Sequence, residues 1–289
     1  MITSGLTMNS QRLIMLWLCL LWPLASLAIT SEDYLSDANA YYERGEYNAA
    51  ILQLKNALRA DPGNGEARML LGKTYTKLGD GPSAVKEFSQ ARDLGVARDA
   101  VLMPLGRAYL MAGQANKLLQ EITHEAGDSP QTEVDILLLH GQAYMEMRGQ
   151  AYLEAERFKM ADEMFSKVLA LQPSHAEGLA GKARIAFHNR DMAGAAELAD
   201  RAIAENSQIV GAWIIKGELS LKAGKPQQAV TAFQKALDTD PGNIPARQGK
   251  TMSLIGLSEY DNALAEVDEL LKRYPYLYMP HYLKGLTQY

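Results

Sequence analysis

Small residues recur along this chain of 289 residues at a fixed interval of 34 positions. The recurring positions are Ala38, Gly72 and Gly106 in the first part of the chain, and Ala183, Gly217, Thr251 and Gly285 in the second. A companion set follows most of them at constant offsets; after Gly217 it consists of Gly224, Ala229, Ala236 and Pro241. An array of equal units has no single core, so the length of the chain does not set its number of domains.

A 34-residue period with this internal spacing is typical of the tetratricopeptide repeat (TPR), a pair of antiparallel helices. Small residues let the two helices approach closely, and aromatic residues such as Phe88, Phe165 and Phe233 fill the remaining space. Prolines such as Pro62 and Pro241 stop the second helix. Glycines are expected to end the first helix in a left-handed conformation, namely Gly45, Gly79, Gly113 and Gly224. We therefore predict an all-α fold, a TPR α-solenoid in which antiparallel helix pairs form a right-handed superhelix.

The period divides the chain into a short N-terminal segment, 1–28, and a solenoid, 29–289. We expect seven repeats and the start of an eighth within the solenoid. Their predicted bounds are 31–64, 65–98, 99–132, 133–175, 176–209, 210–243 and 244–277, with a partial repeat at 278–289.

The fourth predicted repeat is too long because eight residues occur twice. Residues 141–148, which read GQAYMEMR, are nearly repeated by residues 149–156, which read GQAYLEAE. The second copy keeps the usual spacing to Phe165, so we expect it to pair with the second helix of the repeat. Eight helical residues add about 12 Å. We predict a helix longer than its neighbours and a local break in the regularity of the array.

The N-terminal segment has the layout of a cleavable secretory signal. Arg12 is the only charged residue before Glu32, and an apolar run extends from Leu13 to Leu24. Small residues at Ser26 and Ala28 then form a possible cleavage site. The run is too short for a comfortable membrane span, which needs about 20 residues. We expect export to the periplasm, with contact to a membrane only through this segment or through an unproven anchor.

Cleavage after residue 28 would remove Cys19, the only cysteine, together with one arginine, which takes the net charge from −5 to −6. The mature chain would then contain no thiol, so it would form no disulfide, cysteine metal site or thiolate nucleophile. Cys19 also lacks the small preceding residues of a lipoprotein cysteine. An acidic chain of this kind is not built to coat nucleic acid.

No group of residues suggests catalysis, so we expect neither an enzyme nor a cofactor. The five histidines are scattered, and none pairs with another histidine at the short helical spacing of a zinc site. They are His124, His140, His175, His188 and His281.

The first helices of successive TPR units line a concave groove, and we expect this groove to bind a partner. The exposed face of these helices is mixed and contains several cations in an acidic protein. It favours an extended or helical segment with acidic groups. The predicted groove residues are Asn39, Tyr42, Lys73, Lys77, Arg107, Leu110, Gln142, Arg184, His188, Glu218 and Lys222.

Parts of the chain resemble the TPR-repeat proteins of the PEP-CTERM/exosortase system. The resemblance is carried by residues 45–58 (GEYNAAILQLKNAL), 67–72 (ARMLLG), 78–84 (LGDGPSA) and 91–96 (ARDLGV). It implies a bacterial envelope protein associated with exopolysaccharide production and protein sorting. Two features depart from the family: no suitable lipidation cysteine is present, and the family's chains are much longer. We therefore expect the chain to be part of a longer solenoid.

The sequence thus predicts a non-catalytic scaffold that binds protein or peptide segments in the periplasm, with outer-membrane association as a further option. Two alternatives stay open: a chaperone-like peptide receptor, and an accessory TPR region of a longer envelope protein. A receptor of the carboxylate-clamp type needs Lys and Asn one turn apart. Asn39 fits this pattern, but Leu35 stands where the lysine is expected. The oligomeric state does not follow from the sequence.

Overall fold

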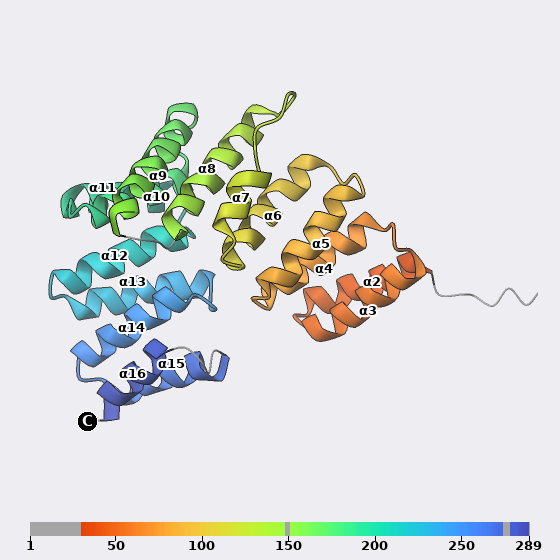
Figure 1. The fold of residues 1–289 in the computed structure, drawn as a ribbon. Helices are drawn as coiled ribbons and strands as arrows, with labels where there is room; N and C mark the ends of the chain where they lie inside the picture. Colours follow the sequence, from red (N-terminus) through yellow and green to blue (C-terminus); the bar gives the residue numbers. More distant parts are fainter. Residues whose placement is uncertain (1–29, 148–150, 274–277, 289) are drawn as a thin grey trace, which may run out of the picture.

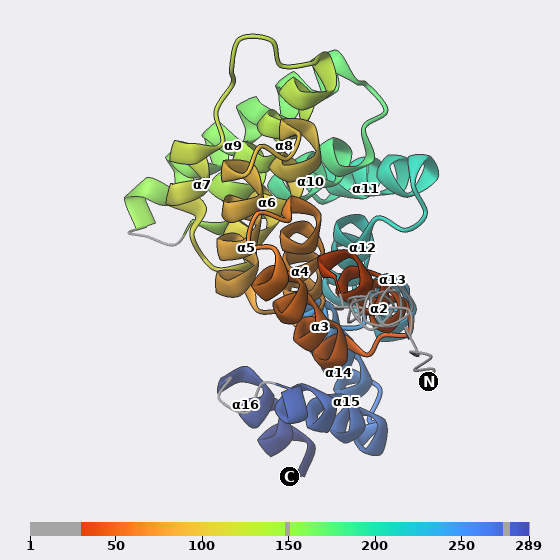
Figure 2. The same cartoon turned by 90° about the vertical axis from the view of Figure 1, so that its right-hand side faces the viewer.

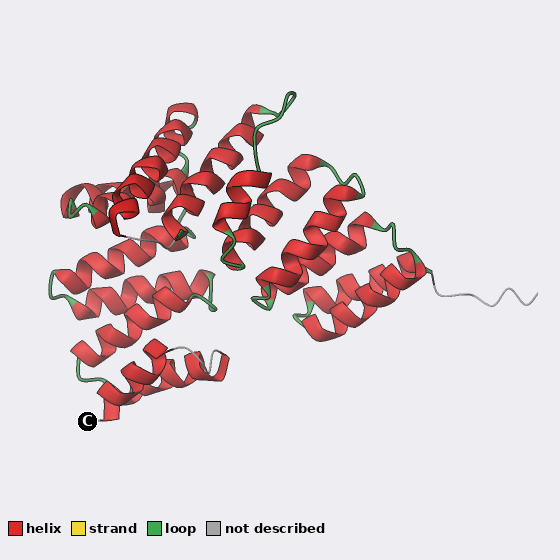
Figure 3. Cartoon of the chain, in the orientation of Figure 1, coloured by secondary structure: helices red, strands yellow, loops and turns green. Residues whose placement is uncertain are grey.

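The computed structural model describes residues 30–147, 151–273 and 278–288. Within these ranges the chain forms fifteen helices and no strand (Figures 1 and 3), which confirms the predicted all-α class. None of these helices combines the length and apolar character needed to cross a membrane. The helices are α2 (Ser31–Glu43), α3 (Tyr47–Ala60), α4 (Gly65–Lys77), α5 (Gly81–Asp93), α6 (Arg98–Met111), α7 (Ala115–Glu121), α8 (Pro130–Glu146), α9 (Ala151–Leu171), α10 (Ala176–His188), α11 (Met192–Glu205), α12 (Val210–Lys222), α13 (Pro226–Thr239), α14 (Ile244–Gly256), α15 (Tyr260–Arg273) and α16 (Tyr278–Gln288).

Consecutive helices form antiparallel hairpins that stack into a curved array (Figure 1), and the view turned by 90° shows that the array also winds out of the plane (Figure 2). The first helices of neighbouring hairpins contact one another, as α10 and α12 or α12 and α14 do. Among the described residues, the second helices of neighbouring hairpins make no such contact. The first helices therefore lie closer together and form the inner, concave face of the solenoid.

Local sequence explains where the helices begin and end. Asn64 and Asn243 cap α4 and α14 by accepting a hydrogen bond from the backbone N–H three residues on. The four glycines expected to end first helices, Gly45, Gly79, Gly113 and Gly224, all have a positive φ, as predicted. Arg190 (φ 64°) and Ser258 (φ 61°) occupy the same turn position without being glycine.

The recurring glycines are required because phenylalanine rings from the second helices lie directly against the first helices. Phe165 of α9 packs against both Gly141 and Gly181, and Phe233 of α13 packs against Gly217 and Gly249. A Cβ atom at Gly217 would lie 2.6 Å from the Phe233 ring, closer than van der Waals contact permits. The small residues that mark the period therefore set the distance between helices.

The third hairpin departs from the regular pattern. Its second helix, α7, has only seven residues, and residues 122–129 continue without helix. Arg98 holds this segment by donating hydrogen bonds to the Asp128 carboxylate (2.8 Å), to Glu125 (2.8 Å) and to the Thr123 carbonyl oxygen. Ser129 caps α8 with Pro130 in its first turn, so that helix begins early.

The duplicated segment produces the predicted long helix, since α9 has 21 residues whereas most second helices have 13 or 14. The predicted role of the two copies was wrong, however. Gly141 of the first copy packs against Phe165, the place expected for the second copy. The second copy instead begins α9, and its Gly149 lies outside the described residues. The extra residues thus lengthen the second helix at its N-terminal end.

Candidate partner-binding groove

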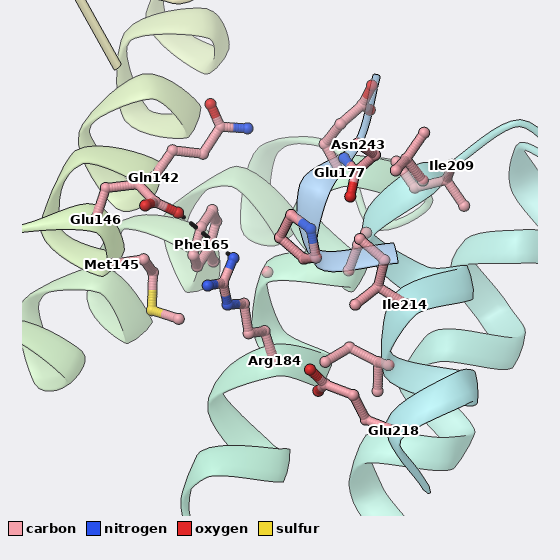
Figure 4. A pocket seen from close by; sticks show the side chains of 16 residues that line it. Gln142, Met145, Glu146, Phe165, Glu177, Arg184, Ile209, Ile214, Glu218 and Asn243 are labelled. Carbon is pink, nitrogen blue, oxygen red and sulfur yellow. Dashed lines mark ion pairs between the residues drawn. The ribbon is translucent and has the colours of Figure 1, made fainter. Parts of the chain in front are cut away.

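A hollow lies on the concave face, where α8, α10, α12 and the start of α14 converge (Figure 4). It has a volume of about 370 Å³. We call it the concave pocket. It is lined by Gln142, Met145, Glu146, Phe165, Glu177, Ala180, Gly181, Arg184, Ile209, Val210, Gly211, Ile214, Ile215, Glu218, Asn243 and Pro245.

The pocket exists because small residues occupy the inner faces of two adjacent first helices. Ala180 and Gly181 of α10 and Gly211 of α12 line it without filling it. Gly181 cannot carry a side chain in this arrangement, since a Cβ atom there would lie 2.6 Å from the Phe165 ring. The apolar floor and walls include Phe165, Ile214 and other aliphatic residues of α12.

The lining residues repeat with the period of the chain. Glu177, Gly211 and Pro245 stand 34 residues apart on three successive first helices, and so do Arg184 and Glu218 on two of them. The pocket is therefore built from equivalent positions of neighbouring hairpins, and each position contributes one row of side chains along the groove.

Charged groups stand around the apolar floor. Arg184 Nη1 lies 3.5 Å from Glu146 Oε1, the ion pair dashed in Figure 4. Glu177 Oε2 lies 3.6 Å from Nδ1 of His175. Glu218 has no hydrogen bond and no ion pair to any described residue. Burial raises the pKa of Glu218, and the more distant Arg184 and Lys222 act in the opposite direction.

Three of the predicted groove residues, Gln142, Arg184 and Glu218, meet in the concave pocket. Two others lie at the ends of the same helices. His188 stacks on Phe158, with ring centroids 3.6 Å apart, and Lys222 Nζ lies 5.4 Å above the Phe187 ring.

The remaining predicted residues lie on earlier hairpins, away from the pocket. Lys73, Lys77 and Arg107 are exposed on α4 and α6. Asn39 donates a hydrogen bond from Nδ2 to the Leu35 carbonyl oxygen (3.1 Å). Tyr42 and Leu110 are partly buried against hydrophobic clusters, so they contribute to packing more than to a surface.

The prediction missed Glu177, Ile214 and the row that contains Gly211 and Pro245. The signal was available, since these residues follow the same 34-residue period one or two turns earlier on each first helix. The described part of the chain contains no group of three or more side chains that could hold a metal ion.

The stacked helical hairpins and the concave pocket define a helical-repeat solenoid. Three parts of the chain match families of this class: residues 38–79 match one described as TPR repeat, and residues 146–208 and 220–276 match two described as tetratricopeptide repeat. The chain belongs to the tetratricopeptide-repeat superfamily.

Known proteins share this fold at low sequence identity. A tetratricopeptide repeat protein from Parabacteroides merdae ATCC 43184 superimposes with a TM-score of 0.58 at 15% identity, over 90% of this chain and 99% of that one. The APC/C hetero-tetramer Cut9-Hcn1 gives a TM-score of 0.56 at 14% identity, over 96% of this chain and 52% of the other. At these identities the likeness shows the fold alone.

One similar protein is the RNA polymerase-associated protein CTR9 of Caenorhabditis elegans. It is 28% identical over 134 residues, which make up 44% of this chain. The match covers 12% of CTR9, so the shared part is a small portion of that protein.

Proposed function

We propose that this chain is a non-catalytic scaffold whose concave pocket binds a segment of a partner protein. Membership of the TPR superfamily suggests a general role in binding other proteins. The concave pocket is the observation in this structure that supports the proposal. It combines an apolar floor with polar groups at its edge, as sites for peptide side chains do. The concave face also offers continuous first helices along which an extended segment can lie.

The scaffold is proposed to act in the bacterial envelope, in exopolysaccharide production or PEP-CTERM/exosortase sorting. The support for this location is the signal-like segment 1–28, which lies outside the described residues, and the resemblance of residues 40–110 to that family. An exported scaffold would bring envelope proteins together after they leave the cytoplasm, either freely in the periplasm or at the outer membrane.

A carboxylate-clamp receptor is less well supported than a scaffold with a mixed groove. Leu35, at the position of the clamp lysine, is buried, and the Asn39 amide is already bonded to the Leu35 carbonyl oxygen. These two residues therefore leave little for a terminal carboxylate to bind at the first hairpin.

Photo-crosslinking tests whether the pocket binds a partner. A photoreactive phenylalanine at position 214 lies in the pocket, and the same residue at position 235 lies on an exposed site of α13 as the matched control. We expect a defined crosslinked protein, named by mass spectrometry, from position 214 only. Equal products from both positions would contradict a specific groove.

Export is tested separately with alkaline phosphatase fused after residue 289, because this reporter is active only outside the cytoplasm. We expect activity from the natural chain and its loss in Leu16→Arg, which interrupts the apolar run of the signal. Equal activity in both fusions would contradict the role of this segment.

A further inference from the structure

The concave pocket carries an excess of negative charge at its edge. Glu146, Glu177 and Glu218 line it, against the single cation Arg184. Arg184 is already engaged by Glu146. Glu177 has only a histidine nearby, at 3.6 Å. The charge of the pocket therefore complements a basic segment, whereas the face as a whole suggested an acidic one.

Glu218 is the carboxylate of the pocket that is half-buried and has no hydrogen bond or ion pair to a described residue. It lies on α12. Burial without a partner disfavours the ionised form, which is why the pKa of Glu218 is raised. A cation placed beside it would favour the ionised form and so offset this penalty.

The apolar surface lies directly beside these carboxylates. Met145, Phe165, Ile214 and Pro245 line the same pocket as Glu177 and Glu218. Lys and Arg side chains combine a long apolar stem with a charged head, so they match a surface with this arrangement. The volume leaves room for a neighbouring apolar side chain in addition.

We infer that the concave pocket binds an extended segment of a partner protein that presents a lysine or arginine side chain next to an apolar one. The cationic head pairs with Glu218 and Glu177, and the apolar side chain packs on Phe165 and Ile214. Gln142, whose amide forms no hydrogen bond in the described structure, stands on the facing wall and is available to the segment's backbone. The inference rests on the proposed function and adds the chemistry of the partner.

The first half of the groove supports this assignment by contrast. Lys73, Lys77 and Arg107 are exposed on α4 and α6 and form no ion pair with any described residue. Three exposed cations of the concave face thus lie on the early hairpins, whereas the one cation that lines the pocket is already paired with Glu146. A basic side chain is attracted to the pocket and repelled by the earlier part, so charge selects where it binds.

The test is selection of a phage-displayed library of random dodecapeptides on the chain purified from its full sequence. Phage that also bind Ile214→Arg are removed first, because that variant fills the pocket. We expect the remaining peptides to be enriched in Lys or Arg beside an apolar residue. One such peptide, labelled with fluorescein, is then compared with its Lys-to-Gln and Lys-to-Glu analogues by fluorescence anisotropy.

Glu218→Gln should weaken binding of the basic peptide about tenfold and leave its Gln analogue nearly unaffected. Glu218→Lys should reverse the order, so that the Glu analogue binds better. Glu197→Gln, the same change at an exposed site of α11, is the matched control and should alter nothing. Circular dichroism of each variant checks that the fold is intact.

The possible failures are distinct. Pocket-dependent peptides without a preference for Lys or Arg, or with a preference for acids, would overturn this inference and leave the proposed function in place. Failure to recover any pocket-dependent peptide, together with no crosslink from position 214, would overturn both.

Discussion

Lys216 Nζ of α12 lies 2.5 Å from Asp200 Oδ1 of α11, so the first helix of one hairpin is bonded to the second helix of the hairpin before it. Lysines 34 residues apart repeat this contact. Lys182 pairs with Asp162, Lys284 pairs with Asp268, and Lys250 bonds to Gln234. The equivalent positions in the early hairpins are the buried residues Leu71 and Leu105. At this one position of the repeat, neighbouring hairpins are therefore joined by a polar contact in the later part and by apolar packing in the earlier part.

This difference predicts unequal effects of removing the two kinds of side chain. Leu105→Ala should lower the free energy of unfolding by about 2–5 kcal/mol, because it leaves a cavity in the core. Lys216→Ala should lower it by less than about 1 kcal/mol, because both partners are well exposed to solvent. Urea unfolding followed by circular dichroism measures both. A larger loss of unfolding free energy in Lys216→Ala than in Leu105→Ala would contradict this prediction and show that the ion pairs stabilise the later hairpins.

The glycines at the 34-residue period positions should also differ in their effect on stability when they are replaced by alanine. Gly217→Ala should destabilise the chain by about 1–3 kcal/mol, because its Cβ would meet the Phe233 ring. Gly285→Ala is the control: it is also helical, but a Cβ there has no atom within 4 Å. It should stabilise α16 by about 0.5–1 kcal/mol through higher helix propensity. Hydrogen exchange of α12 and α16 reports each change locally, and similar effects at both sites would contradict the packing argument.

Introducing glycine at two turns is predicted to increase the stability of the fold. Arg190 and Ser258 adopt a left-handed conformation that side chains disfavour. Arg190→Gly and Ser258→Gly should each raise the free energy of unfolding by about 0.5–1 kcal/mol. Gly224→Ala, which places a Cβ in the same conformation, should have the opposite sign. Thermal unfolding of the three variants decides the point, and a loss of stability in both glycine variants would refute it.

The segment 122–129 should loosen in acid. The Asp128 carboxylate accepts hydrogen bonds from Arg98 and from the Glu125 N–H, which hold the pKa of Asp128 below its ordinary value of 3.8. A carboxyl with a lowered folded pKa stabilises the fold above its unfolded pKa, and this contribution is lost as the pH falls through the folded value. Hydrogen exchange of residues 122–129, corrected for its intrinsic pH dependence, should therefore accelerate below about pH 4.

Asp128→Asn provides the control for this pH dependence. It removes the titrating group, so the segment should already exchange faster at neutral pH and show little further change in acid. If hydrogen exchange accelerates equally in acid in the natural chain and in the variant, a group other than Asp128 causes the acceleration.

Much of the fold follows from local patterns. The glycines at the ends of first helices, the Asn caps at residues 64 and 243 and the 34-residue period all act within a few turns of chain. Helix existence and the hairpin arrangement could therefore be read from the residues alone. The early end of α7 could not, because the segment after Glu121 is held by Arg98, which lies more than twenty residues earlier.

The concave pocket was predicted only in part for a similar reason. Arg184 and Glu218 lie on the expected face, and the period places Glu177 and Gly211 on it as well. The convergence of the lining residues depends on the distances and angles between four hairpins. Between the hairpins of α8 and α10, this geometry is set by how Phe165 fits between Gly141 and Gly181, which no single repeat contains.

The sequence by itself determined that this protein is an array of helical hairpins, because its period and turn residues specify each hairpin locally. Only the tertiary structure decided which copy of the duplicated octapeptide packs against Phe165, since the two copies are nearly identical and differ only in what surrounds them. It also decided that Glu218 stands half-buried without a partner beside an apolar floor. That arrangement depends on contacts between hairpins, and it is the one from which the chemistry of a binding partner can be inferred.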